Sequence, residues 1–321
     1  RRAQSNYYKR RFNVDVDPET EVIVTLGSKE GLANLASAIT SNGDQVIVPN
    51  PSYPIHPYGF IIAGAYVLSI DSSPNENFIK NLYKILSSSN NKAKALVLNY
   101  PNNPTTRMAS LDFFREVVEM CIKYGVYILS DIAYAEIYFD GVVPSSILEV
   151  PKAKNIAIEF SSLSKTYSMP GWRVGFAVGN KKLIEALTKI KSYLDYGAFT
   201  PVQVAAIAAL NGPQECVDEI RSTYMKRRDI LVEGFSRIGW DIIPPKATMF
   251  VWASLPEKYL NIGSLEFSKM LLKYGKVAVA PGIGFGENGE GFVRIGLVEN
   301  EYRIRQAIKN IKLFFDDYEG K

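Results

Sequence analysis

Residues 161–175 read Ser-Ser-Leu-Ser-Lys-Thr-Tyr-Ser-Met-Pro-Gly-Trp-Arg-Val-Gly, and they are the strongest indication of the fold. This segment follows one apolar run, 155–160, and leads into another, 174–178, and both runs are predicted to be buried strands. The loop between them carries hydroxyl groups, a lysine, Lys165, and an arginine, Arg173. Hydroxyls and a guanidinium suit a phosphate group, and a lysine beside them suits a Schiff base with a phosphorylated aldehyde. A polar surface loop is the alternative, but the spacing of the lysine, the arginine and the glycines favours a phosphate site.

Apolar runs alternate with helical patterns around this segment. The predicted buried strands are 45–48, 65–70, 95–98 and 126–129, and the predicted helices are 30–41, 78–88 and 111–124. Alternation of strands and helices over roughly 200 residues is typical of an α/β domain with a mostly parallel sheet.

The pattern changes after Gly212-Pro213. A long, charged helix is predicted near 214–238. Short apolar segments follow at 240–243, 249–252 and 292–295, and further helices are predicted near 264–274 and 301–315. This arrangement indicates a smaller α+β domain. We therefore expect a large domain, residues 1–220, and a small C-terminal domain, residues 221–321, with the long helix bridging the two.

The composition argues against several functional classes. The 321 residues are 47% hydrophobic and 22% charged, as in an ordinary soluble globular protein. The net charge of +4, from 37 basic and 33 acidic residues, gives no case for binding nucleic acid or a membrane surface. The longest apolar stretches, such as 60–68, are too short to span a membrane.

Cysteine and histidine usage narrows the possibilities further. The two cysteines suggest no disulfide framework, so a reducing cytoplasm is the expected location. His56, the one histidine, cannot form a metal site, and no Cys/His cluster exists, so no metal is expected. We interpret His56 as a structural residue or as a support behind the site.

Ligands of open α/β sheets bind beyond the carboxyl ends of the strands. The predicted strand 126–129 runs into Ser130 and Asp131, and Tyr134 follows three residues later. A carboxylate at the end of a buried strand is costly unless a cation pairs with it, which makes Asp131 a candidate site residue. A carboxylate that caps a helix N-terminus is an equally good interpretation at this point.

The segment Ser162–Gly175 resembles the cofactor-lysine signature of the class I and II aminotransferases, the fold-type-I enzymes that use pyridoxal 5′-phosphate (PLP). The resemblance covers essentially the whole chain, because further motifs follow in the family's order. It implies that Lys165 holds PLP. It also implies a homodimer with active sites at the subunit interface, which the composition itself does not indicate.

The resemblance implies a set of residues that bind the phosphate end of PLP. The segment 27–31, Gly-Ser-Lys-Glu-Gly, opens a helix, whose N–H groups and dipole favour an anion. An ordinary helix cap is the alternative for this segment, and both interpretations can hold together. The residues expected around this end of the cofactor are Ser28, Lys29, Ser162, Ser164 and Arg173.

Other residues match those that hold the pyridine ring in the family. Tyr53 resembles the aromatic residue that stacks on the ring, although a packed turn tyrosine is a serious alternative. Asn103 and Tyr134 are expected at the phenolic oxygen of the cofactor. Asp131 is expected to pair with the protonated ring nitrogen, and a cationic ring withdraws electrons from the substrate carbanion. The resemblance therefore implies that Lys165, Asp131 and Tyr134 are catalytic.

The family's mechanism implies roles toward the substrate. Arg294 matches the arginine that clamps the substrate α-carboxylate, a bidentate task that suits arginine, and Asn103 is expected beside it. A surface salt-bridge arginine is the alternative, but Arg294 lies in an otherwise apolar run. The Lys165 amine is expected to act as a general base between the substrate Cα and the cofactor C4′. Two half-reactions, one with an amino acid and one with a 2-oxo acid, then give ping-pong kinetics.

Three segments, 51–59, 190–197 and 281–286, closely resemble bacterial alanine (glutamate–pyruvate) aminotransferases. They predict L-alanine and L-glutamate as amino donors, with pyruvate and 2-oxoglutarate as acceptors. LL-diaminopimelate aminotransferases are the next nearest group. Aspartate aminotransferases that take a second arginine from the partner subunit carry it in the region matching 192–200, which has no arginine here. An aspartate enzyme that uses another cation stays open.

Rival interpretations remain within and outside this chemistry. A lyase or synthase on the same fold would share most of the motifs, and a PLP-sensing domain or a binding-only remnant would be non-catalytic. Intact Asp131, Lys165, Arg173 and Arg294 favour catalysis.

Family members carry further N-terminal residues before the point that matches Arg1, including a tyrosine that reaches the neighbouring subunit's phosphate, and we expect that this region is not represented here.

Overall fold

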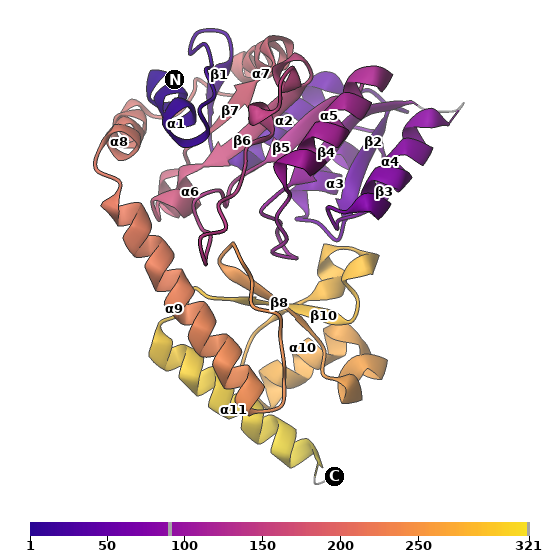
Figure 1. Ribbon diagram of the computed structural model, residues 1–321, viewed down its shortest axis with the longest axis vertical. Helices are drawn as coiled ribbons and strands as arrows, with labels where there is room; N and C mark the ends of the chain where they lie inside the picture. Colours follow the sequence, from indigo (N-terminus) through magenta and orange to yellow (C-terminus); the bar gives the residue numbers. More distant parts are fainter. Residues whose placement is uncertain (89–91, 320–321) are drawn as a thin grey trace.

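A computed structural model describes residues 1–88 and 92–319 and contains two sheets (Figure 1). The larger sheet has seven strands in the order β1-β7-β6-β5-β4-β2-β3. These strands are β1 (Val22–Thr25), β2 (Gln45–Asn50), β3 (Tyr66–Asp71), β4 (Ala93–Asn99), β5 (Tyr127–Asp131), β6 (Ala157–Ser162) and β7 (Gly175–Gly179). Neighbouring strands from β3 to β6 are parallel, and β7 is antiparallel to both β6 and β1. The predicted α/β class with a mostly parallel sheet is confirmed.

One face of the large sheet is covered by three neighbouring helices. The helix α2 (Ser28–Ile39) packs against both α3 (Ile55–Ile62) and α7 (Lys181–Leu194). Apolar side chains of all three, such as Phe60 and Leu187, are buried with alternate residues of the strands. Because successive strand residues point to opposite faces, the remaining strand side chains belong to a second cluster on the other face.

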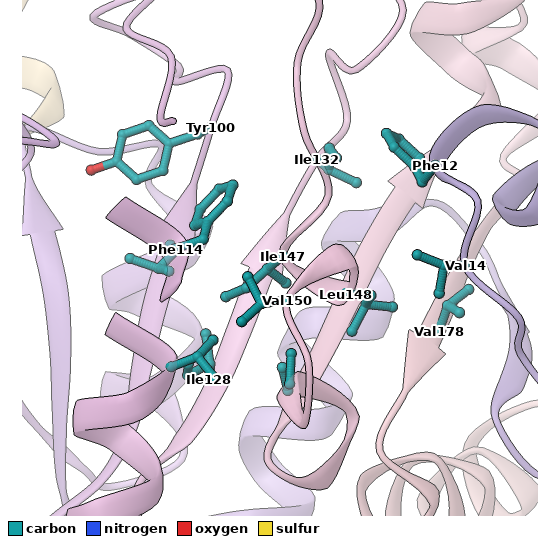
Figure 2. Close-up of a cluster of buried hydrophobic side chains, with 14 of the residues drawn as sticks. Phe12, Val14, Tyr100, Phe114, Ile128, Ile132, Ile147, Leu148, Val150 and Val178 are labelled. Carbon is teal, nitrogen blue, oxygen red and sulfur yellow. The ribbon is translucent and has the colours of Figure 1, made fainter. Parts of the chain in front are cut away.

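That second face carries α1 (Arg2–Phe12), α4 (Glu76–Ser87), α5 (Leu111–Tyr124) and α8 (Thr200–Asn211). Figure 2 shows part of the cluster, with Phe114 of α5 and Ile128 of β5, and with Phe12 and Val14 beside Val178 of β7. The end of α1 and the residues after it are therefore packed into the core of the large sheet. Burial of such apolar side chains stabilises the fold by about 1.5–3 kcal/mol each.

The smaller sheet lies in the C-terminal part of the chain. Its antiparallel strands are β8 (Phe250–Ser254), β10 (Phe292–Gly296) and β9 (Ala280–Pro281), in that order. Its helices are α9 (Glu215–Arg237), α10 (Gly263–Lys273) and α11 (Glu301–Glu319). Its own core contains Phe235 and Trp240, whose rings stack with centroids 4.6 Å apart. Because Figure 1 shows α9 running from the large sheet to the small one, and residue 220 falls within α9, we keep the division at 220 as a proposed domain boundary.

The structure differs from the predicted elements at several boundaries. The strand predicted at 155–160 occupies Ala157–Ser162, because a one-turn 3₁₀ helix at Ala153–Asn155 precedes it. The helix predicted at 78–88 begins at Glu76, because the Asn75 side chain accepts hydrogen bonds from the first turn. The strand β1 and the helices α3, α7 and α8 were not predicted at all.

Within the described ranges, no helix is both long and apolar enough to cross a membrane.

Candidate active site

A cavity of about 260 Å³ lies beyond the carboxyl ends of β4, β5 and β6. Every site residue predicted from the sequence lines it, although these residues come from segments spread between positions 28 and 294. The structure adds Asn99, Ala133 and Phe250, which the sequence did not indicate. The parallel register brings Asn99 of β4 level with Asp131 of β5, so the ends of adjacent strands meet at the cavity.

Lys165 lies on a short helix, α6 (Leu163–Thr166), that begins directly after β6. The Ser162 side chain caps this helix by accepting a hydrogen bond from the N–H of Ser164, at 3.3 Å. Burial lowers the pKa of the Lys165 amine, and the nearby guanidinium groups of Arg173 and Arg294 lower it further. A larger fraction of the amine is therefore neutral, which is the form that reacts with an aldehyde.

Asp131 is the last residue of β5 and its carboxylate is buried. Its Oδ1 accepts a hydrogen bond from the N–H of Ala133, at 3.1 Å, and its Oδ2 lies 3.1 Å from Nε2 of His56. The side-chain amide of Asn99 donates to the Asp131 carbonyl at 2.8 Å. Asp131 therefore holds the turn after the strand and presents a fixed carboxylate to the cavity, whereas the helix-cap interpretation is wrong because no helix begins at these described residues.

The start of α2 and Arg173 form the basic end of the cavity. Arg173 donates to the carbonyl of Leu26, at 3.1 Å, and to the carbonyl of Pro170, at 3.0 Å. Gly27, with φ of 92°, lies directly against this guanidinium, and a Cβ at this position would overlap its Nη2 atom. The N–H groups of the first turn, beginning at Ser28, point from the helix N-terminus, where the helix dipole favours an anion.

Arg294 lies on β10 of the small sheet and reaches the same cavity. Its Nη1 donates to Oδ1 of Asn103 at 2.6 Å, and its guanidinium lies 4.2 Å from the ring centroid of Phe250 and 4.6 Å from that of Phe285.

Burial and then the nearby Asp131 carboxylate raise the pKa of Tyr134, so its phenol is protonated and can donate a hydrogen bond.

The charge of the cavity fits PLP. Among the described residues that line it, the cationic side chains are Lys29, Lys165, Arg173 and Arg294, and Asp131 is the carboxylate. This positive excess suits a phosphate dianion together with a substrate carboxylate, while Asp131 suits a protonated ring nitrogen. The role of each residue toward the cofactor stays a prediction, but the donors match the chemistry of the group.

Comparison with known proteins supports the same family. The family described as aminotransferase class I and II matches residues 1–311. A putative aminotransferase AatC of Rhizobium meliloti is 57% identical over 314 residues, which cover 98% of this chain and 78% of that protein. The glutamate-pyruvate aminotransferase AlaC of Escherichia coli is 53% identical over 315 residues, covering 98% and 76%. The structure of an aromatic aminotransferase from Pyrococcus horikoshii matches with a TM-score of 0.92 at 26% identity, covering 99% of this chain and 85% of that one.

Proposed function

This chain belongs to the class I and II aminotransferases, and we propose that it transfers an amino group between L-alanine or L-glutamate and the acceptors pyruvate or 2-oxoglutarate. The family uses PLP, so the chain is a PLP-dependent aminotransferase. The observation that carries the proposal is the cavity in which Lys165, Asp131 and Arg294 meet. The choice of alanine and glutamate is supported by the 53% identity with the glutamate-pyruvate aminotransferase of Escherichia coli.

Lys165 has two tasks in the proposed reaction. When bound, PLP supplies an aldehyde that reacts with primary amines and a ring that withdraws electrons from the substrate Cα. Lys165 would hold the cofactor through its amine and, when that amine is free, would move a proton at the substrate Cα as a general base. Its lowered pKa keeps the amine neutral at lower pH than an exposed lysine would allow.

The remaining side chains orient the reacting groups. Asp131 favours a proton on the ring nitrogen, because a buried carboxylate stabilises a nearby cation. Arg173 and the start of α2 hold the phosphate, together with the hydroxyl groups of the cavity. Arg294 holds the substrate α-carboxylate, and its hydrogen bond to Asn103 and the two flanking rings fix its guanidinium.

Two alternative substrates remain within the family. An LL-diaminopimelate or aspartate donor would need a group in the site that recognises a charged side chain. The segment 192–200 offers no arginine for this purpose, which disfavours one type of aspartate enzyme. Lys29 is the cation of the cavity that could bind a second carboxylate in place of such an arginine. Its Nζ lies 5.7 Å from the ring centroid of Tyr53.

We also propose that two copies of the chain form a dimer through the end of α7 and the residues after it. Four large apolar side chains of this segment are mostly exposed: Tyr193, Leu194, Tyr196 and Phe199. Exposed large apolar side chains gathered on one segment are typical of an interaction surface. Sedimentation velocity of the PLP-loaded protein tests this, and a monomer with full activity would contradict it.

A cytoplasmic location is a further proposal. Both cysteines carry free thiols, with Cys121 buried and Cys216 exposed. An exposed thiol stays reduced in a compartment that contains glutathione and thioredoxin. Cell fractionation followed by detection of the protein would test the location.

The proposed substrates are tested by titrating separate samples of the PLP-loaded protein with L-alanine, L-aspartate or LL-diaminopimelate, without any oxo acid, while the visible absorbance is recorded. We expect alanine to convert the spectrum to that of pyridoxamine phosphate and aspartate to leave it unchanged. Conversion by aspartate or by LL-diaminopimelate alone would replace the substrate assignment. A bound cofactor that no amino acid converts would favour a non-catalytic PLP-binding domain.

The role of Lys165 is tested with Lys165→Ala. This variant should bind PLP without covalent attachment and lose turnover, because the general base is missing. Borohydride reduction followed by mass spectrometry locates the attached lysine in the wild-type protein. Transamination near the wild-type rate in the variant would overturn the assignment.

A further inference from the structure

Lys191 is a buried lysine near the end of α7, and its ammonium lies between two carboxylates. Its side chain is only 6% exposed, and its Nζ lies 2.8 Å from Oε1 of Glu30 and 2.8 Å from Oδ2 of Asp195. Taking an ammonium out of water is costly unless such partners surround it. The three side chains therefore form one unit, in which each carboxylate is held in place by the same lysine.

The Glu30 side of this unit leads to the basic end of the cavity. Glu30 lies in the first turn of α2, and its Oε2 accepts a hydrogen bond from the N–H of Leu26, at 2.8 Å. The carbonyl of Leu26 in turn accepts from Nη2 of Arg173, at 3.1 Å. Hydrogen bonds on either side of the Leu26 backbone thus link Lys191, through Glu30, to the arginine assigned to the cofactor phosphate.

The Asp195 side leads to the exposed apolar segment. The N–H of Asp195 donates to the Lys191 carbonyl at 2.9 Å, and Oδ1 of Asp195 accepts from the N–H of Gly197 at 2.7 Å. These bonds fix the turn that follows α7. The flanking side chains of Tyr193, Tyr196 and Phe199 point into solvent on the surface that we assign to the second copy of the chain.

We propose that Lys191 is a positioning residue that couples the phosphate-binding loop, residues 26–28 at the start of α2, to the subunit interface at residues 193–199. This inference rests on the proposed PLP site and the proposed dimer. Docking of a second copy on 193–199 holds Asp195, and Asp195 keeps the Lys191 ammonium against Glu30. Glu30 in turn keeps Leu26 in the position that Arg173 requires. Because such coupling is reciprocal, bound phosphate also favours association. Without the ammonium, Glu30 and Asp195 repel each other, and the two ends move independently.

A purely structural ion pair would give a different result, and the chain offers a matched control. Lys154 lies in the same domain, and its Nζ lies 3.0 Å from Oε2 of Glu21 and 2.9 Å from the carbonyl of Asp15. Among the hydrogen bonds of the described residues, none joins Lys154 to the phosphate-binding loop or to the 193–199 segment. Lys154→Met therefore removes an ion-paired lysine, more exposed than Lys191 at 36% against 6%, without breaking the proposed link.

The experiment measures the dissociation constant of PLP at protein concentrations below and above the dissociation constant of the dimer. The full chain is used as wild type and as the variants Lys191→Met, Lys191→Arg and Lys154→Met. We expect wild type to bind PLP about tenfold more tightly when it is associated, a typical coupling. In Lys191→Met this ratio should fall close to one, while Lys191→Arg and Lys154→Met should keep it.

A second variant guards against loss of folding in Lys191→Met. Asp195→Ala removes only the link to the interface and leaves Lys191 on Glu30, so it should lose the concentration dependence while the dissociated protein binds PLP as wild type does. The inference would be overturned if both Lys191→Met and Asp195→Ala kept the ratio of PLP affinities that wild type shows. It would also be overturned if the PLP affinity of wild type did not depend on protein concentration. Failure of wild type to bind PLP at any concentration would instead overturn the proposed function.

Discussion

Nε2 of His56 lies 3.1 Å from Oδ2 of Asp131, and both side chains are buried. The imidazole also packs edge-on against the ring of Tyr53, with centroids 6.0 Å apart. His56 belongs to α3, the helix that begins just after Tyr53, so one short segment supplies both the ring predicted to stack on the cofactor and the partner of the carboxylate. With Ala133 on the other oxygen, Asp131 is held from two sides.

Replacing His56 with Phe should lower kcat/KM by about 10- to 100-fold, since a hydrogen bond to a charged group contributes about 1.5–3 kcal/mol. The carboxylate would keep its charge but lose the donor that fixes its direction. His56→Gln, which retains an N–H donor, should show a smaller loss. Steady-state kinetics at saturating PLP measure both variants. Equal rates for His56→Phe and wild type would show that Asp131 needs no such support.

Gly27 is predicted to be irreplaceable because of its contact with Arg173. In Gly27→Ala the new methyl group would overlap Nη2 of Arg173, and the alanine backbone would have to adopt a φ of 92°. Gly43→Ala is the matched control, because it has a φ of 89° with nothing within 4 Å of the new Cβ. Both variants should lose about 1 kcal/mol of stability from backbone strain, while only Gly27→Ala should weaken PLP binding, by tenfold or more, at about 1.4 kcal/mol per tenfold. Equal PLP affinities in the two variants, measured by absorbance titration, would contradict the role of this contact.

Arg294→Lys should raise KM for L-alanine by about 10- to 100-fold and affect PLP binding little. Lysine keeps the charge but cannot bond two carboxylate oxygens and Asn103 with one planar group. It would also lose the stacking between Phe250 and Phe285. The comparison of KM with the dissociation constant of PLP separates substrate binding from cofactor binding. An unchanged KM would mean that another group holds the substrate carboxylate.

The positions of Asp131 and Lys165 were predictable because a parallel sheet brings the carboxyl ends of its strands to one edge. Asn99 and Asp131 are direct register partners, and Lys165 follows the next strand along the sheet. Local sequence therefore sufficed to place Asp131 and Lys165 near each other. The resemblance to the family added Arg294, which reaches the cavity from a different sheet.

Contacts between distant segments without a periodic pattern were not predictable. His56 and Asp131 are 75 positions apart, and a lone histidine beside a predicted turn does not indicate its partner. Lys191 and Glu30 are 161 positions apart, and a lysine in an amphipathic helix usually faces solvent. Phe285 lies in a glycine-rich loop, whose packing against Arg294 depends on how the small sheet is placed.

Glu159 lies in β6 with its carboxyl group fully buried behind the site. The hydroxyls of Tyr8, Ser130 and Ser146 and the N–H of Ile147 all donate to it. Burial raises its pKa from 4.5 to about 7, against the opposing effect of these hydrogen bonds. The folded protein thus binds a proton at Glu159 more tightly than the unfolded chain does.

A raised folded-state pKa contributes stability that is fully present below the unfolded value of 4.5 and is lost as the pH rises through about 7. The free energy of unfolding of the wild-type protein should therefore fall, relative to Glu159→Gln, by about 2 kcal/mol between pH 5 and pH 8. Glu290→Gln is the control, because the pKa of Glu290 is lowered and its contribution changes only at more acidic pH. Urea unfolding of the PLP-free protein at several pH values measures the difference. If wild type and Glu159→Gln show parallel pH profiles, Glu159 is already ionised in the folded protein at pH 5, and its four donors outweigh its burial.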